Sequence, residues 1–95
     1  MSAYWIAHVT VTDAEAYKGY QALAPMAFAA HGARFLARGG EAATLEGPAL
    51  DRHVVIEFPT LDAARACYAS AEYQAAKARR DGACIAHVVI VQGLD

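Results

Sequence analysis

The order of strand-like and helical hydrophobic patterns is the feature that most constrains how this chain of 95 residues can fold. Four runs have the composition or the period-two alternation of strands, at residues 4–11, 33–38, 52–58 and 85–91. Alanine-rich segments with apolar residues at three- and four-residue steps separate the first run from the second and the third from the fourth. The predicted order is therefore strand, helix, strand, strand, helix, strand.

Capping residues and prolines set the expected limits of the first helix. Thr12 or Asp13 can cap its start, because their side-chain oxygens accept hydrogen bonds from the first free backbone N–H groups. We expect this helix to end by Gly32. Pro25 lacks a backbone donor and clashes with the preceding turn, so a kink or a restart is expected near that residue.

The second helical region divides into two capped segments. Thr60 follows a proline and can cap the first segment, and Ser70 has the position of a new cap.

Between the two middle strands, Gly39 and Gly40 permit backbone angles that other residues avoid. We expect a bulge or a bend there, leading into a hairpin tip at residues 47–51.

This order of elements predicts an α+β fold of the ferredoxin-like βαββαβ type, with helices on one face of a four-stranded antiparallel sheet. We expect residues 1–95 to form a single domain. The other sheet face also carries apolar residues, and the hydrophobic fraction of the chain is 57%. Since an apolar sheet face needs a cover, we expect a second copy of the chain to form a homodimer through it.

Charge and cysteine usage exclude several classes of partner. The formal charge is −2 and the eight Lys and Arg residues form no basic stripe, so nucleic acid is not an expected partner. No apolar segment reaches about 18 residues, and no secretory pattern precedes the first strand, so we expect a cytoplasmic protein without a membrane span. Cys67 and Cys84 have no redox-pair or metal-knuckle spacing and are expected to be free thiols.

The histidines show no metal-binding motif. None of His8, His31, His53 and His87 has the HxxxH or HExxH spacing that places two imidazoles on one helical face. We therefore predict neither a metal nor a cofactor. His8 and His87 lie in strands that are neighbours in this fold, so their side chains can approach each other.

Charged residues within the strands are the first candidates for a site. Strand parity places His53 and Glu57 on one side of the sheet, and it places Arg34 and Arg38 together as well. A carboxylate such as Glu57 among apolar neighbours either faces solvent, pairs with an arginine or lines a wet pocket.

Tyrosines on the helices are the second group of candidates, listed here as Tyr17, Tyr20, Tyr68 and Tyr73. Packing in the core is the ordinary role of such rings. Alternatively, their hydroxyls form a row of donors between helices and sheet, where Arg34 or Arg38 can hold an anion by a forked contact. No Ser-His-Asp arrangement or phosphate loop is indicated.

Several segments together resemble one family, the domain of unknown function family 1330. They are RFLARGG at residues 34–40, LEG at 45–47, residues 52–59 and residues 68–74. The similarity covers nearly the whole chain, although Ala71 stands where the family usually has proline. The resemblance implies a dimeric α+β barrel built on a ferredoxin-like fold, and it implies no established activity. The wider barrel group includes cofactor-independent oxygenases, lactone isomerases and haem-binding enzymes.

The leading hypothesis is a homodimer that binds a small anionic or aromatic molecule between helices and sheet. The candidate lining residues are His8, Tyr20, Arg34, Arg38, Glu57 and Tyr73. One alternative is a cofactor-independent oxygenase or isomerase in which a His or Tyr moves a proton. Another is a structural assembly module. A pocket favours binding or catalysis, whereas a densely packed interior favours the module.

Overall fold

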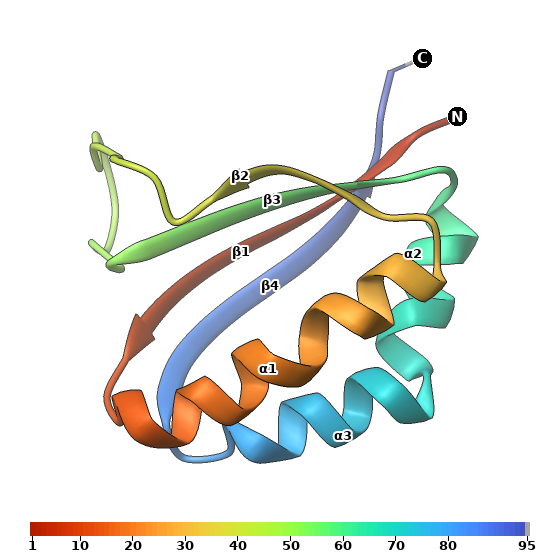
Figure 1. Ribbon diagram of the computed structural model, residues 1–95. Helices are drawn as coiled ribbons and strands as arrows, with labels where there is room; N and C mark the ends of the chain where they lie inside the picture. Colours follow the sequence, from red (N-terminus) through yellow and green to blue (C-terminus); the bar gives the residue numbers. More distant parts are fainter. Residues whose placement is uncertain (95) are drawn as a thin grey trace.

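The computed structural model describes residues 1–94, which form one sheet with three helices on one of its faces (Figure 1). The elements are β1 (Ala3–Val11), α1 (Ala14–Ala30), β2 (Arg34–Arg38), β3 (Arg52–Phe58), α2 (Leu61–Ala69), α3 (Ala71–Arg79) and β4 (Cys84–Gln92). The strand order is β2-β3-β1-β4, and every neighbouring pair is antiparallel. The predicted element order and ferredoxin-like fold are therefore confirmed.

The hydrophobic core lies between the sheet and the helices. Alternate residues of β1 point to this side, and Trp5 is only 1% exposed. Its indole ring packs edge-on against Phe28 and Tyr73, with ring centroids 5.0 Å away in each case. The ring of Phe58 stacks on it at 5.9 Å. Since one ring contacts α1, α3 and β3 together, Trp5 fixes the spacing between the two layers.

The other face of the sheet, which we call the open face, has no helix over it (Figure 1). Period-two alternation directs Ile85, Val89 and Val91 of β4 to this face, where they are 53%, 55% and 46% exposed. The predicted uncovered apolar face is thus present. His8 and His53 also lie on it, directly opposite each other across β1 and β3.

An irregularity in β2 changes which side its residues face. Arg34 pairs with Glu57, but the register shifts between Phe35 and Ala37, so that Arg38 pairs with Val54. Such a bulge reverses the alternation of all later residues in the strand. The prediction that Arg34 and Arg38 share one side is wrong for this reason: Arg34 lies on the open face and Arg38 on the helix side.

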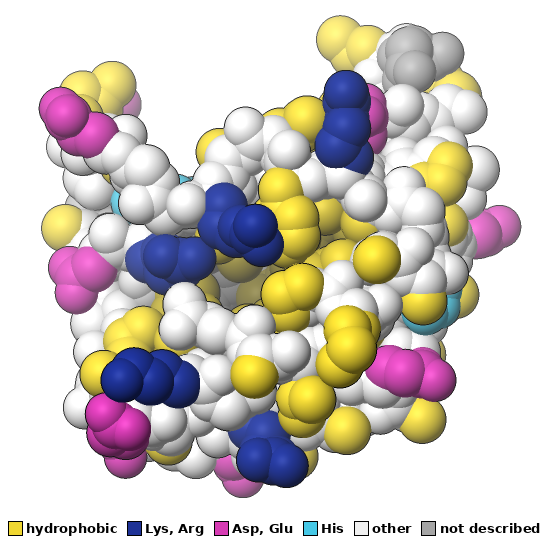
Figure 2. Space-filling model, viewed as in Figure 1, with side chains coloured by type: hydrophobic (Ala, Val, Ile, Leu, Met, Phe, Trp, Pro, Cys, Tyr) yellow, Lys and Arg dark blue, Asp and Glu magenta, His cyan; other side chains and the backbone are white. Residues whose placement is uncertain are grey.

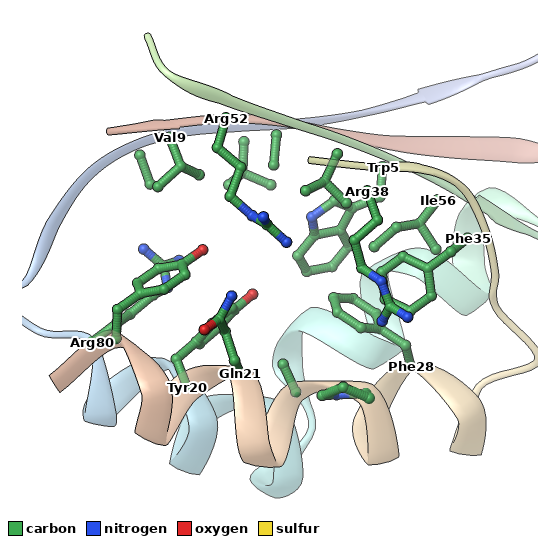
Figure 3. Close-up of a pocket in the computed structure, with 17 residues that line it drawn as sticks. Trp5, Val9, Tyr20, Gln21, Phe28, Phe35, Arg38, Arg52, Ile56 and Arg80 are labelled. Atoms are coloured by element: carbon green, nitrogen blue, oxygen red, sulfur yellow. The ribbon is translucent and has the colours of Figure 1, made fainter. Parts of the chain in front are cut away.

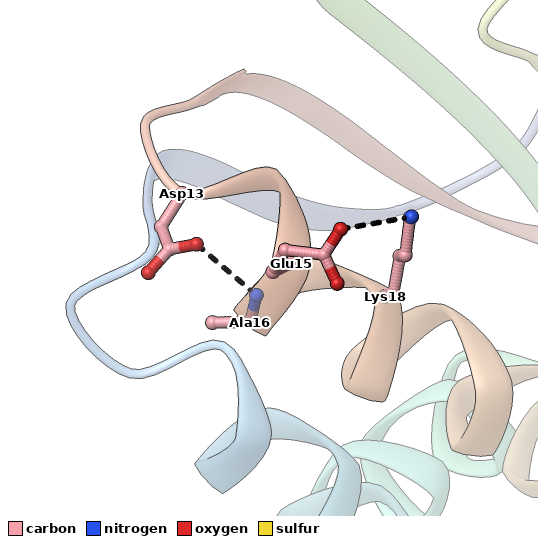
Figure 4. A network of polar contacts seen from close by, with 4 residues as sticks. All are labelled: Asp13, Glu15, Ala16 and Lys18. Carbon is pink, nitrogen blue, oxygen red and sulfur yellow. Dashed lines mark hydrogen bonds and ion pairs between the residues drawn. The ribbon is translucent and has the colours of Figure 1, made fainter.

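Helix α1 begins at its predicted cap. The Asp13 carboxylate accepts a hydrogen bond of 3.2 Å from the backbone N–H of Ala16, and Lys18 forms an ion pair of 3.1 Å with Glu15 in the first turn (Figure 4). The expected restart at Pro25 does not occur, because α1 is one continuous helix. Proline removes a single backbone hydrogen bond there, and burial of the apolar residues on both sides of it holds the helix together.

The second helical region is divided as predicted. The Thr60 hydroxyl accepts a hydrogen bond of 3.0 Å from the backbone N–H of Ala63 at the start of α2. Ser70 ends α2 and caps α3, because its hydroxyl accepts a hydrogen bond of 3.1 Å from Tyr73 N–H. The chain also bends at Gly39, where φ is +71°, and the segment from there to β3 extends beyond the sheet (Figure 1).

No helix within residues 1–94 is both long enough and apolar enough to cross a membrane.

Candidate functional site

A cavity of about 210 Å³ lies between α1 and the sheet, and we call it the α1 cavity. Side chains from the sheet and from α1 face one another across it (Figure 3). Most of its lining is apolar or aromatic, and it includes Trp5, Val54 and Ile56 of the sheet and Tyr20, Gln21 and Phe28 of α1. An apolar cavity with a few polar groups is the usual form of a small-molecule site.

Three arginines supply the charge of the α1 cavity: Arg38 from β2, Arg52 from the start of β3 and Arg80 from the end of α3. None of these guanidinium groups forms an ion pair with a carboxylate of the described residues. Figure 2 shows Lys and Arg side chains beside hydrophobic ones at the hollow between sheet and helix. The α1 cavity is therefore cationic, although the whole chain has a formal charge of −2.

The Arg80 side chain contacts two tyrosines and a cysteine, and no carboxylate of the described residues. Its Nη2 donates to the Tyr73 hydroxyl and its Nη1 to the Cys84 sulfur, both at 3.4 Å, and its guanidinium carbon lies 4.9 Å from the Tyr20 ring centre. Its Nε is buried and has no hydrogen-bond partner. Burial disfavours the charged form, but the hydrogen bonds to Tyr73 and Cys84, together with the electrostatic effect of Tyr73 and Tyr20, raise the pKa of Arg80. Its charge is consequently permanent and uncompensated.

The Arg52 guanidinium packs directly against the backbone at Gly39. A methyl group added to Gly39 would overlap that guanidinium, and the φ of +71° at Gly39 is also unfavourable for other residues. The positive φ therefore favours glycine at this position, and an added methyl would in addition displace the flexible end of the Arg52 side chain. Beside it, the Arg38 guanidinium carbon lies 4.0 Å from the centre of the Phe35 ring, in a cation–π contact.

Tyr20 brings a hydroxyl to the α1 cavity. It shares a hydrogen bond of 3.0 Å with the hydroxyl of Tyr73, which is fully buried behind it. Burial, together with the neighbouring Tyr73, raises the pKa of Tyr20 far above its ordinary value. Tyr20 thus remains protonated at neutral pH and can hydrogen-bond a ligand, but it is a poor proton acceptor.

The structure separates the predicted site residues into groups. Tyr20 and Arg38 line the α1 cavity, and Tyr73 supports Tyr20 from the core. His8 lies on the open face, where its Nδ1 is 2.8 Å from Nδ1 of His53. His8 also pairs with His87 of β4 in the strand register, so these two histidines lie on adjacent strands as predicted.

Arg34 and Glu57 form the third group, also on the open face. Arg34 Nη2 lies 2.8 Å from Glu57 Oε1, which makes pairing with an arginine the observed role of this carboxylate. Glu57 shares the face of His53, as strand parity predicts. These two residues do not converge with Tyr20 or Arg38.

Sequence reasoning missed Arg52 and Arg80. Arg52 has the same strand parity as Val54 and Ile56, so an arginine on the core side of β3 was a usable signal. Arg80 gave no comparable signal, because a basic residue at a helix end is ordinary.

The described residues show neither a metal-ligand cluster nor a reactive Cys67 thiol. Within residues 1–94, no group of three His, Cys, Asp or Glu side chains is arranged to hold a metal ion. Cys67 is fully buried, and burial raises the pKa of its thiol to about 11. It is therefore a neutral core group and not a nucleophile.

Similar folds occur in proteins of both unknown and known activity. A protein of unknown function from Rhodopseudomonas palustris has a TM-score of 0.80 and 19% identity, covering 99% of this chain and 83% of that chain. A dimeric protein of unknown function with a ferredoxin-like fold, from Bacteroides fragilis, has a TM-score of 0.66 and 13% identity, covering 97% of this chain and 96% of that chain. SnoaB, a cofactor-independent oxygenase from Streptomyces nogalater, has a TM-score of 0.65 and 14% identity, covering 99% of this chain and 94% of that chain.

At these identities the structural likeness shows the fold alone. A search of the curated proteins finds no match for this chain. The model of one family, described as domain of unknown function DUF1330, matches residues 2–94. Because this match spans nearly the whole sequence, the chain belongs to the DUF1330 family.

Proposed function

We propose that this protein binds a small aromatic molecule with an anionic group in the α1 cavity. The observation that carries the proposal is the set of three arginines without acidic partners around an aromatic cavity. The volume of about 210 Å³ exceeds the roughly 150 Å³ cavity that accepts benzene in an engineered protein. One ring with an acidic substituent is therefore a suitable occupant.

Each part of such a ligand has a matching partner in the cavity wall. Arg52 is half-buried, and a guanidinium in a partly dry site forms strong, forked contacts with a carboxylate. The rings of Trp5, Tyr20 and Phe28 offer faces and edges to an aromatic body. Binding would thus combine apolar burial with compensation of a cation that has no protein partner.

The lining supports binding more than proton-transfer catalysis. Among the described residues that border the α1 cavity, none is a histidine, aspartate or glutamate. The remaining candidate acceptors are Tyr17 and Tyr20, and burial raises the pKa of both, so they hold their protons at neutral pH. An oxygenase or isomerase that uses a residue as base would need such a group next to its substrate.

Trp5 provides the assay, because it is the single tryptophan of the chain and borders the α1 cavity. Benzoate should change its fluorescence with saturation, and Arg52→Gln should weaken binding about tenfold through loss of one charge-assisted contact. Lys18→Gln removes the same charge from the exposed side of α1 and should leave the affinity unchanged. No saturable change with wild-type protein, or equal affinities for Arg52→Gln and wild type, would refute the proposal.

The second part of the proposal is a homodimer formed through the open face. Its exposed Ile85, Val89 and Val91 make an apolar surface that a second copy can cover. A relative of the same fold from Bacteroides fragilis is dimeric. Light scattering should give twice the chain mass, and Val89→Asp should give a folded monomer. A wild-type monomer at micromolar concentration would refute this part.

Cytoplasmic residence also belongs to this proposal. It is supported by two free thiols, Cys67 and Cys84, which a reducing compartment maintains.

A further inference from the structure

The three arginines are distributed along the α1 cavity instead of gathering at one end. Figure 3 shows Arg80 and Arg38 on opposite sides of the view, with the Arg52 guanidinium between them, pointing toward α1. Their elements explain the spread, since Arg80 follows α3 whereas Arg38 ends the edge strand β2. A ligand with one acidic group can therefore reach only part of this charge.

The end of the cavity at Arg80 is cationic beyond the cavity itself. A second hollow meets it there, and Arg80, Ala86 and Val88 border both. Arg65 and Lys77 also line this second hollow, and neither forms an ion pair with a described carboxylate. Their charges add to that of Arg80 and attract an anionic group to this end.

Charge compensation favours a ligand with more than one anionic group. A monocarboxylate neutralises one guanidinium and leaves two uncompensated around the cavity. For Arg80 this is costly, because the side chain is half-buried and its hydrogen-bond partners are a tyrosine hydroxyl and a cysteine sulfur, with no carboxylate among them. A second acidic group near Arg80 would remove that cost, while the apolar walls require an uncharged middle.

We infer that the preferred ligand of the α1 cavity is an aromatic dicarboxylate whose two acidic groups lie at opposite ends of the ring. One carboxylate contacts Arg80, and the other lies between Arg38 and Arg52. This inference rests on the proposed function and adds the number and placement of the charges. A phosphate monoester carries two charges on one group, so it can satisfy only one end of the cavity.

The test compares four probes by isothermal titration calorimetry: benzoate, benzene-1,2-dicarboxylate, benzene-1,4-dicarboxylate and phenyl phosphate. The 1,2 isomer is the matched control, because it has the charge of the 1,4 isomer with both groups on one side. We expect the 1,4 isomer to bind at least tenfold more tightly than each of the other three. Equal affinities for the two isomers, or a preference for phenyl phosphate, would overturn the inference and leave the proposed function standing.

Two variants test which arginines contact each carboxylate of the ligand. Arg80→Gln should reduce the advantage of the 1,4 isomer over benzoate to about twofold or less, with little change for benzoate. Arg38→Gln should weaken benzoate and the 1,4 isomer by similar factors, because both place a carboxylate between Arg38 and Arg52; it is safe for folding because Arg38 is exposed on an edge strand. An unchanged advantage of the 1,4 isomer over benzoate in folded Arg80→Gln, or unchanged affinities for both probes in folded Arg38→Gln, would overturn the inference. Failure of all four probes to bind the wild type would instead refute the proposed function.

Discussion

Replacing Gly39 with alanine should damage stability and ligand binding together. The backbone of Gly39 has a φ of +71°, and an L-residue in this left-handed region costs about 1 to 2 kcal/mol. The added methyl would also overlap the Arg52 guanidinium, which must move away from its place at the cavity. Displacing Arg52 should remove one charge-assisted contact with an anionic ligand, or about tenfold in affinity.

Two other glycines of the same connection separate these effects. Gly47 has a φ of +88° but open space around the position of an added methyl, so Gly47→Ala tests backbone strain alone. Gly40 has neither a positive φ nor a described neighbour within 4 Å of that position, so Gly40→Ala should be almost neutral. Gly39→Ala and Gly47→Ala should both lower the free energy of unfolding, but only Gly39→Ala should weaken benzoate binding.

Urea denaturation gives the difference in free energy of unfolding between each variant and the wild type. In a domain of this size, each kcal/mol of that difference corresponds to about 4 to 8 °C in Tm. Titration followed by Trp5 fluorescence gives the affinity. If Gly39→Ala and Gly47→Ala bind benzoate equally well, the assigned link between Gly39 and Arg52 is wrong. If Gly39→Ala is as stable as Gly40→Ala, the backbone argument fails as well.

Two further predictions concern pH and helix capping. The pKa of the buried Cys67 thiol is about 11 in the folded protein, against 9.0 for an ordinary cysteine. The stability that the folded protein gains from burying the protonated thiol is therefore complete below pH 9 and is lost as pH rises through about 11. Wild type should lose at most about 2 to 3 kcal/mol more than Cys67→Ala between pH 8 and 11 in urea denaturation, and parallel pH profiles would contradict this. Asp13→Ala removes the cap of α1 and should cost about 1 kcal/mol, whereas Asp62→Ala, outside a cap position, should cost less by the same measurement.

Much of the fold could be predicted from local patterns. Asp13, Thr60 and Ser70 begin helices where their side chains suggest, because a cap depends only on backbone groups two or three residues away. The apolar open face of β4 also follows from simple alternation. Of the kink or restart expected at Pro25, the restart does not occur, since the loss at Pro25 is outweighed by burial that only the packed structure provides.

The candidate site was only partly predictable. Tyr20 and Arg38 were recognised by residue type, although Arg38 was assigned to the side of Arg34. Strand parity fails beyond a bulge, and nothing in the local sequence fixes where the extra residue stands. His8 was a candidate for its place in β1, but its side chain points to the open face.

The sequence by itself determined the element order, the helix caps and the apolar character of both sheet faces, because these depend on neighbours along the chain. Tertiary structure decided how charge is arranged around the α1 cavity. Arg52 and Arg80 come from separate elements, and only strand register and helix packing bring them to one cavity with Arg38. Convergence through space depends on those long-range contacts, and no short window of sequence contains them.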